Sequence, residues 1–243
     1  MINFIGKCVL NLIQSIKYMF EGRVRFSAVI SNAATIGYDS IPIALVIVFI
    51  ASVVISLQIS KQFLMSGGES YVGGFMAVAL IRELAPGFAA LAISARAGTA
   101  VSAEIANMKV TSQVDAIKTL KVDPVGYYFA PRIIAAAITV PAIVILAEFF
   151  GIIGGMVVSY FTIGLHPARY INSVWLWINT KDLYISVLKG FIFGILITTV
   201  CATQGYSTEG GAKNVGISTT EAAIKATVIL LAVDLLIALL FYF

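Results

Sequence analysis

The chain has 243 residues, of which 60% are hydrophobic and only 12% charged, and its mean hydropathy is +0.98. Soluble domains carry about 25% charged residues, and disordered chains combine low hydrophobicity with high charge, so the composition excludes both classes. The net charge of +4 does not indicate a nucleic-acid partner, because an excess of Lys and Arg on cytoplasmic loops accounts for it in a membrane protein. Two distant cysteines and a single histidine favour neither a disulfide framework nor a His-based metal site.

Residues 1–30 form the first predicted element. Their apolar residues recur at helical spacing, and they are Ile5, Val9, Leu12, Ile16 and Met19. Polar residues, among them Lys7 and Lys17, fall on the other faces. This pattern predicts an amphipathic helix that lies in the membrane interface.

Five segments are apolar enough to cross a bilayer core, which takes about 20 helical residues. We expect these spans at 40–62, 71–95, 125–162, 183–204 and 218–243. The third is too long for one straight span and too short for two, so it should be one helix that projects beyond the core. The second contains Pro86, and we expect it to break there because proline lacks a backbone N–H.

Loop charges predict the orientation. An odd number of spans puts the two ends of the chain on opposite sides of the membrane. Nine Lys and Arg residues fall on the N-terminal side and three on the other side. The positive-inside rule therefore predicts a cytoplasmic N-terminus and a C-terminus on the opposite, periplasmic side.

Ionisable side chains inside the predicted spans mark a candidate site, because charges at membrane depth are costly and usually functional. Five stand out: Arg82, Glu83, Glu148, Lys189 and Asp234. All except Glu148 are expected at overlapping depths, where two positive and two negative charges neutralise one another. Two interpretations stay open: a polar patch that binds a lipid headgroup through Arg82 and Lys189, and a purely structural ion-pair network. No partner for Glu148 is evident from the sequence.

The stretch around Pro86 adds residues to this candidate site. Backbone that is not helical at membrane depth is tolerated only inside protein or beside a cavity, so Arg82–Pro86 should face the interior. Phe75 and Val78 could contact acyl chains there, or simply pack. The predicted substrate cavity therefore comprises Phe75, Val78, Arg82, Glu83, Pro86, Lys189 and Asp234.

Residues 99–120, between the second and third spans, are predicted to form one amphipathic helix on the cytoplasmic side. Such a helix can receive force from a soluble motor protein, and packing on the membrane surface is the equal alternative. The candidate coupling residues are Glu104, Met108, Lys109, Val110 and Asp115.

Several motifs carry a family resemblance: RELAP (82–86), AISARAGTAVSAEIANMKVTSQVDAI (92–117), VDP (122–124), APR (130–132), DLYISVLKGFIFG (182–194) and GAKNVGISTTEAA (211–223). Through them the chain resembles the MlaE/YrbE family, the permease subunits of ABC lipid transporters that work with Mce-domain proteins. It departs from that family at Ala85 and Ala95, where Gly is usual, and at Ser112, where Glu is usual.

The resemblance implies an all-α integral membrane protein with one permease domain over 1–243, acting as a homodimer in the bacterial inner membrane. It implies a non-catalytic subunit that moves phospholipid between that membrane and a periplasmic Mce-domain protein, and so maintains outer-membrane lipid asymmetry. No cofactor would be bound directly, since ATP and Mg would bind to a separate cytoplasmic ABC ATPase docked on the coupling helix at 99–120. The chain indeed lacks a GxxxxGK[ST] phosphate loop.

The alternative is an ion-coupled secondary transporter that uses Glu83, Lys189 and Asp234 as a charge relay. Such transporters usually contain internal repeats, which we do not find in this sequence.

Overall fold

The computed structural model describes residues 2–242, which are mostly helical and contain no β-strand. Met1 and Phe243, the ends of the predicted 1–243 domain, lie outside the described residues. Five helical stretches are long and apolar enough to cross a membrane: Phe26–Met65, Glu69–Val110, Pro124–Ile163, Thr180–Tyr206 and Ala212–Tyr242. The predicted all-α fold with five spans is therefore confirmed.

The chain divides into two compact units. The first unit comprises Met1–Ser40, Ile93–Val140 and Phe191–Phe243, and the second comprises Ile41–Ala92 and Pro141–Gly190. The chain passes from one unit to the other within α5 (Ala85–Ile93), α8 (Pro124–Ile163) and α10 (Thr180–Tyr206) and at the start of α3 (Ile41–Met65).

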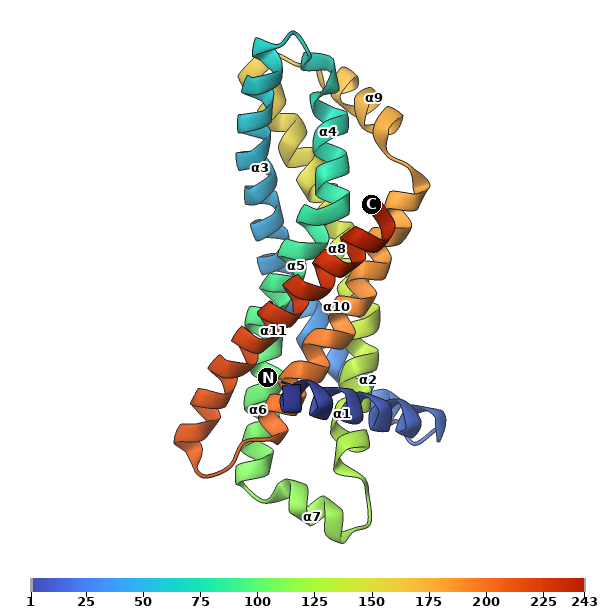
Figure 1. The fold of residues 1–243 in the computed structure, drawn as a ribbon, viewed down its shortest axis with the longest axis vertical. Helices are drawn as coiled ribbons and strands as arrows, with labels where there is room; N and C mark the ends of the chain where they lie inside the picture. Colours follow the sequence, from blue (N-terminus) through green and yellow to red (C-terminus); the bar gives the residue numbers. More distant parts are fainter. Residues whose placement is uncertain (1, 243) are drawn as a thin grey trace. The chain divides into compact units, whose positions relative to one another are not determined.

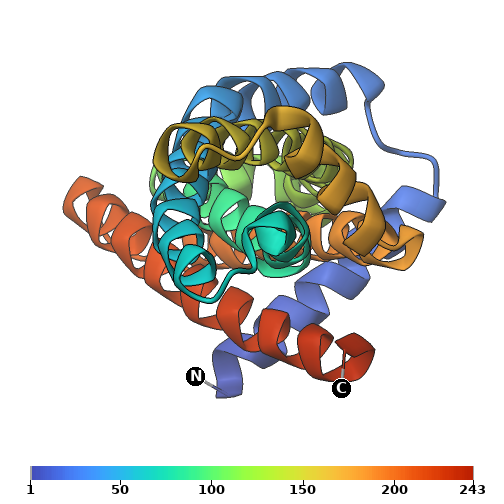
Figure 2. The same ribbon diagram turned by 90° about the horizontal axis from the view of Figure 1, so that it is seen from above.

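The second unit contains α3, the 3₁₀ turn η3 (Glu69–Tyr71), α4 (Val72–Ala79), the π-helical turn η4 (Leu80–Leu84) and α9 (Pro167–Trp177). In Figures 1 and 2, α9 lies beside α4. Two glycines allow this close approach: a Cβ on Gly73 would lie 2.4 Å from the carbonyl oxygen of Tyr170, and the Gly74 N–H donates to Ser173 Oγ at 2.9 Å.

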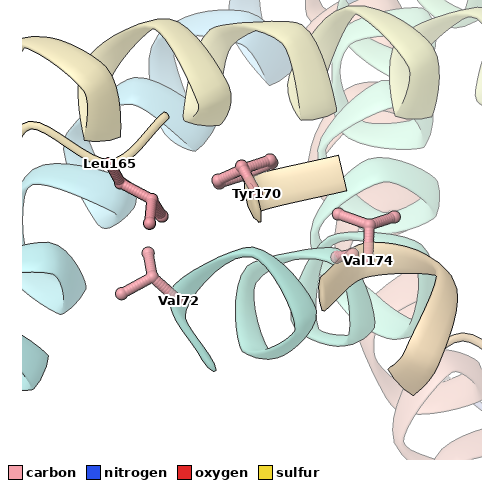
Figure 3. Close-up of a cluster of buried hydrophobic side chains, with 5 residues drawn as sticks. Val72, Leu165, Tyr170 and Val174 are labelled. Carbon is pink, nitrogen blue, oxygen red and sulfur yellow. The ribbon is translucent and has the colours of Figure 1, made fainter. Parts of the chain in front are cut away.

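A small apolar core joins these elements. The buried side chains of Val72, Leu165, Tyr170 and Val174 gather where α4 meets α9 (Figure 3). Burial of these side chains, and not backbone propensity alone, holds a helix as short as α9 in place.

Serines line the buried face of α3 at every fourth position. Ser52 Oγ donates to the Gly151 carbonyl at 2.6 Å, and the hydroxyl oxygens of Ser60 and Ser159 lie 3.2 Å apart. Such small residues let two membrane helices approach closely. The opposite face of α3 exposes Val46 and Ile50, as expected for a span that faces lipid.

The first unit contains α1 (Ile2–Phe20), α2 (Phe26–Asn32), the turns η1 (Ala33–Gly37), η2 (Tyr38–Ser40) and η5 (Ser94–Gly98), and the helices α6 (Thr99–Val110), α7 (Gln113–Thr119) and α11 (Ala212–Tyr242). Helix α6 packs against α11. Gly205 permits a further close approach, since a Cβ there would lie 2.5 Å from the Ser102 carbonyl oxygen.

The amphipathic helix predicted near the N-terminus is present as α1. Its polar side packs on the protein: Asn11 donates to Thr203 Oγ1 at 3.0 Å and Gln14 donates to Asp123 Oδ1 at 2.8 Å. Its apolar residues Ile5, Val9 and Ile16 stay 40–50% exposed. That exposure suits contact with lipid, and the interfacial position of residues 1–30 stays a prediction. The helix ends at Phe20, and α2 already belongs to the first candidate span.

Two predictions about local structure were wrong. The second span does not break at Pro86: the helical stretch Glu69–Val110 continues through it, because the π-helical turn η4 comes directly before and Pro86 occupies the first turn of α5. The coupling segment 99–120 is not one helix. It divides into α6 and α7 at Thr111–Ser112, where Ser112 adopts a left-handed φ of 61°.

Candidate functional site

One face of α10 carries a row of buried polar side chains. Asp182, Ser186 and Lys189 are spaced four and three residues apart, which places them on the same side of the helix. Each is at most 2% exposed. Each has a partner on another element of the second unit, so this row organises the polar interior of that unit.

Arg82, at the centre of η4, pairs with Asp182. The Arg82 Nε lies 2.9 Å from Oδ1 and Nη2 lies 3.3 Å from Oδ2, a two-pronged contact typical of arginine and carboxylate. Asp182 also accepts a bond from the Asn179 N–H at 3.2 Å, so it closes the turn before α10 as well.

Lys189 is fully buried and makes two bonds with the same turn. Its Nζ lies 2.7 Å from Glu83 Oε2 and 2.8 Å from the carbonyl oxygen of Arg82. In an α-helix that carbonyl would accept a bond from the N–H of residue 86, which proline lacks. Lys189 therefore supplies the donor that Pro86 cannot, and single π-helical turns of this kind are frequent at functional sites.

Glu148, whose role was open from the sequence, belongs to the same row. Its carboxylate is buried and accepts a hydrogen bond from the Ser186 hydroxyl. Sequence reasoning missed both Ser186 and Asp182 as partners. The seven-residue interval from Asp182 to Lys189 does predict that both lie on one face of a helix, and both are on α10, but this spacing does not identify Arg82 as the partner of Asp182.

The remaining predicted cavity residues are distributed as follows. Pro86 is buried, Val78 is half-buried, and Phe75 is 43% exposed with its ring 5.7 Å from that of Phe63. Asp234 lies on α11 in the first unit, and its grouping with the charges of the second unit stays a prediction. Thus Arg82, Glu83 and Lys189 come together as expected. Within residues 2–242, no group of three His, Cys, Asp or Glu side chains could hold a metal ion.

The predicted coupling residues fall into two classes. Glu104 on α6 pairs with Arg132 Nη2 at 2.7 Å, and the Arg132 side chain is only 6% exposed. Met108 and Val110 are half-buried at the end of α6. This part of the segment is therefore fixed to the first unit.

Helix α7 is the more exposed part of the coupling segment. Asp115 is exposed and pairs with Lys118 Nζ at 3.0 Å and Lys109 Nζ at 3.7 Å. The hydrogen bond from Lys118, followed by the charge of Lys109, lowers the pKa of the Asp115 carboxyl below its ordinary value. Val114 is buried and anchors α7.

Residues 29–240 match the family described as Permease MlaE. The chain is 34% identical over 209 residues to a probable ABC transporter permease protein of Synechocystis sp., covering 86% of this chain and 80% of the relative. Identity to a probable ABC transporter permease protein of Rickettsia prowazekii is 33% over 216 residues, covering 89% and 83%. The Arabidopsis thaliana protein TRIGALACTOSYLDIACYLGLYCEROL 1, chloroplastic, is 25% identical over 229 residues, covering 94% and 65%. With its five candidate spans, this chain is a multi-pass membrane protein that belongs to the MlaE family of ABC transporter permeases.

Proposed function

We propose that this permease carries phospholipid between the bacterial inner membrane and a periplasmic Mce-domain protein, and so maintains outer-membrane lipid asymmetry. It acts as a homodimer without catalytic activity of its own, with a cytoplasmic N-terminus and a periplasmic C-terminus. A separate cytoplasmic ABC ATPase binds ATP and Mg and docks on α7.

The observation that carries the proposal is the charged π-helical turn η4 beside an apolar helix face. A phospholipid phosphate needs a cation or backbone donors, and the Arg82 side chain is 34% exposed although it pairs with Asp182. Phe75 and Val78 precede it on α4, where acyl chains would lie. One helical stretch thus offers a cation for a lipid headgroup at Arg82 and apolar side chains for its acyl chains at Phe75 and Val78.

Two further observations support a lipid and a partner ATPase. The name of the Arabidopsis relative contains that of a glycolipid, trigalactosyldiacylglycerol. The exposed α7 is the part of the coupling segment best placed for a soluble partner, since Glu104 is held by Arg132.

A charge-removal pair tests whether Arg82 contacts the headgroup. The chain would be reconstituted in liposomes with its ATPase and Mce partner, and transfer of a fluorescent phospholipid would be measured. Arg82→Gln should abolish transfer. The double variant Arg82→Gln/Asp182→Asn replaces the ion pair with neutral amides, so it should restore stability without restoring transfer. Recovery of transfer in the double variant would mean that Arg82 acts only as an ion-pair partner.

Affinity purification tests the partners. Mass spectrometry of the gently solubilised chain should find a stoichiometric ATPase, an Mce-domain protein and phospholipid. Asp115→Lys should reduce ATPase recovery, whereas Ser70→Lys, an exposed change in the η3 turn at the other end of the second candidate span, should not. An oligomer without ATPase that transports on a proton gradient would favour the ion-coupled alternative.

A further inference from the structure

Helix α9, between the third and fourth spans, has an apolar exposed face as well as a buried one. Tyr170, Ser173 and Val174 pack toward α4 and are at most 6% exposed. On the other side, Trp175 is 75% exposed and Leu176 is 83% exposed. Contact with water alone would be unfavourable for such large apolar side chains side by side.

The exposed face changes character along the helix. Its N-terminal half presents Ala168, Arg169, Asn172 and the 41% exposed Ile171, and its C-terminal half presents Trp175 and Leu176. Ala168 and Leu176, near the two ends of this face, lie about 12 Å apart along the axis, from the rise per residue. The exposed apolar side chains therefore begin near the middle of the helix and are most exposed at its C-terminal end, as expected of a helix that enters a membrane surface at an angle.

The apolar end is continuous with a membrane span. Trp177 ends α9, and α10 begins three residues later at Thr180. The exposed Tyr184, at 74%, continues the aromatic surface on α10. Tryptophan and tyrosine are enriched at the membrane–water interface because an apolar ring and a polar N–H or O–H suit that layer.

We propose that the C-terminal half of α9 is inserted into the lipid leaflet at this end of α10, while its N-terminal half remains in water. Trp175 and Leu176 lie among the glycerol groups and upper acyl chains. Arg169 and Lys181, both exposed, supply positive charge toward the phosphates. The occupant is the bulk leaflet and not a transported molecule, so the inference is independent of the proposed substrate.

Insertion would also position the site. The Gly74 N–H bonds Ser173 on α9, and Asp182, which pairs with Arg82, accepts from Asn179 directly after α9. The leaflet therefore holds α4 and the beginning of α10 at a set depth through α9.

The two tryptophans of the chain, Trp175 and Trp177, both lie on α9, so intrinsic fluorescence reports on this helix alone. The full chain carrying Trp177→Phe would be reconstituted in phosphatidylcholine–phosphatidylglycerol vesicles. Lipids brominated near the headgroup end of the acyl chain should quench the fluorescence of Trp175 strongly, whereas acrylamide in the water should quench it only weakly. The Trp175→Phe variant retains Trp177, whose ring packs on Gly74 and near Tyr71, and should be quenched less by both.

A matched pair of substitutions completes the test in the Trp177→Phe background. Leu176→Asp should shift Trp175 emission to longer wavelength and raise acrylamide quenching, whereas Ala168→Asp, on the same face but in the aqueous half, should change neither. Strong acrylamide quenching without bromolipid quenching in the parent protein would overturn the proposal. So would acrylamide protection that appears only when a partner protein is added, which would assign the face to protein docking.

Discussion

Removal of the buried Lys189 ammonium is the most direct perturbation of the polar row. Lys189→Met keeps a long, flexible side chain but deletes the donor to both Glu83 Oε2 and the Arg82 carbonyl. The carbonyl then has neither Lys189 nor an N–H at Pro86. We expect a large loss of stability, because a buried polar group without a partner costs more than a hydrogen bond contributes.

The magnitude follows from burial. An unsatisfied buried carbonyl costs about 1–3 kcal/mol. Breaking a fully buried ion pair costs about 3–5 kcal/mol. The Glu83 side chain is 42% exposed, so the loss of its contact with Lys189 should destabilise the protein by much less than that. We therefore expect the free energy of unfolding to fall by about 2–4 kcal/mol.

A double-mutant cycle with Pro86 isolates the backbone contribution. Pro86→Ala restores an N–H that can bond the Arg82 carbonyl, so Lys189→Met should cost about 1 kcal/mol less in that background. Unfolding would be measured in mixed micelles of mild detergent and dodecyl sulfate, with the α9 tryptophans as reporter.

The control is Lys225→Met, which removes a pair with Glu221, whose side chains are 27% and 49% exposed, and a bond to Gln204 Oε1 at 2.9 Å. It should cost about 1 kcal/mol. Strict additivity of Lys189→Met and Pro86→Ala would refute the assignment of Lys189 as the substitute donor.

Three further outcomes are expected from the structure. Gly73→Ala should weaken the packing of α4 on α9, because the added Cβ would lie 2.4 Å from a backbone oxygen of α9. Gly216→Ala lies in a helix with open space around it and should stabilise the protein by about 0.5–1 kcal/mol. Thermal unfolding in detergent compares the two variants. Ser52→Ala should cost about 1 kcal/mol through its lost bond to a backbone carbonyl. Ser56→Ala should cost little in the same assay, because its hydroxyl has no hydrogen-bond partner among the described residues. The pKa of the Asp115 carboxyl, measured by NMR titration, should lie below its ordinary value of 3.8. The stabilisation from its lysine contacts is then complete above pH 3.8 and is lost as the pH falls through the lowered pKa. A titration midpoint above 3.8 would contradict those contacts.

Hydropathy was sufficient to predict the spans, because about 20 apolar residues have few alternatives to crossing a bilayer. The estimated membrane depth of each charge was sufficient to predict that Arg82 and Glu83 lie near Lys189, since oppositely charged groups at one depth are stabilised by pairing. The seven-residue spacing places Asp182 on the same helical face as Lys189, but the fourth span was expected to begin at 183, so Asp182 was not counted among the intramembrane charges or paired with Arg82. The helix begins at Thr180, which places Asp182 inside the first turn of α10.

The local backbone was harder to predict, because it depends on residues distant in sequence. Proline in a helix predicts a disruption, but the pattern around Pro86 does not specify whether the chain breaks or forms a π-helical turn. That outcome depends on a donor from α10, over 100 residues later. The division of 99–120 depends similarly on packing: α6 is held by α11 and Arg132, and the chain turns at Ser112, beyond that contact.

The connection between Pro86 and Lys189 also explains why a membrane helix can carry a charged π-helical turn at all. A carbonyl without a donor would be costly in a bilayer, so the turn requires a polar partner at that point. A lysine can serve, but its own charge then needs an anion, and Glu83 supplies one within the same turn. The charge pairing and the backbone geometry are therefore one energetic unit. We therefore expect that a change which draws Glu83 away from Lys189 would also weaken the bond from Lys189 to the Arg82 carbonyl.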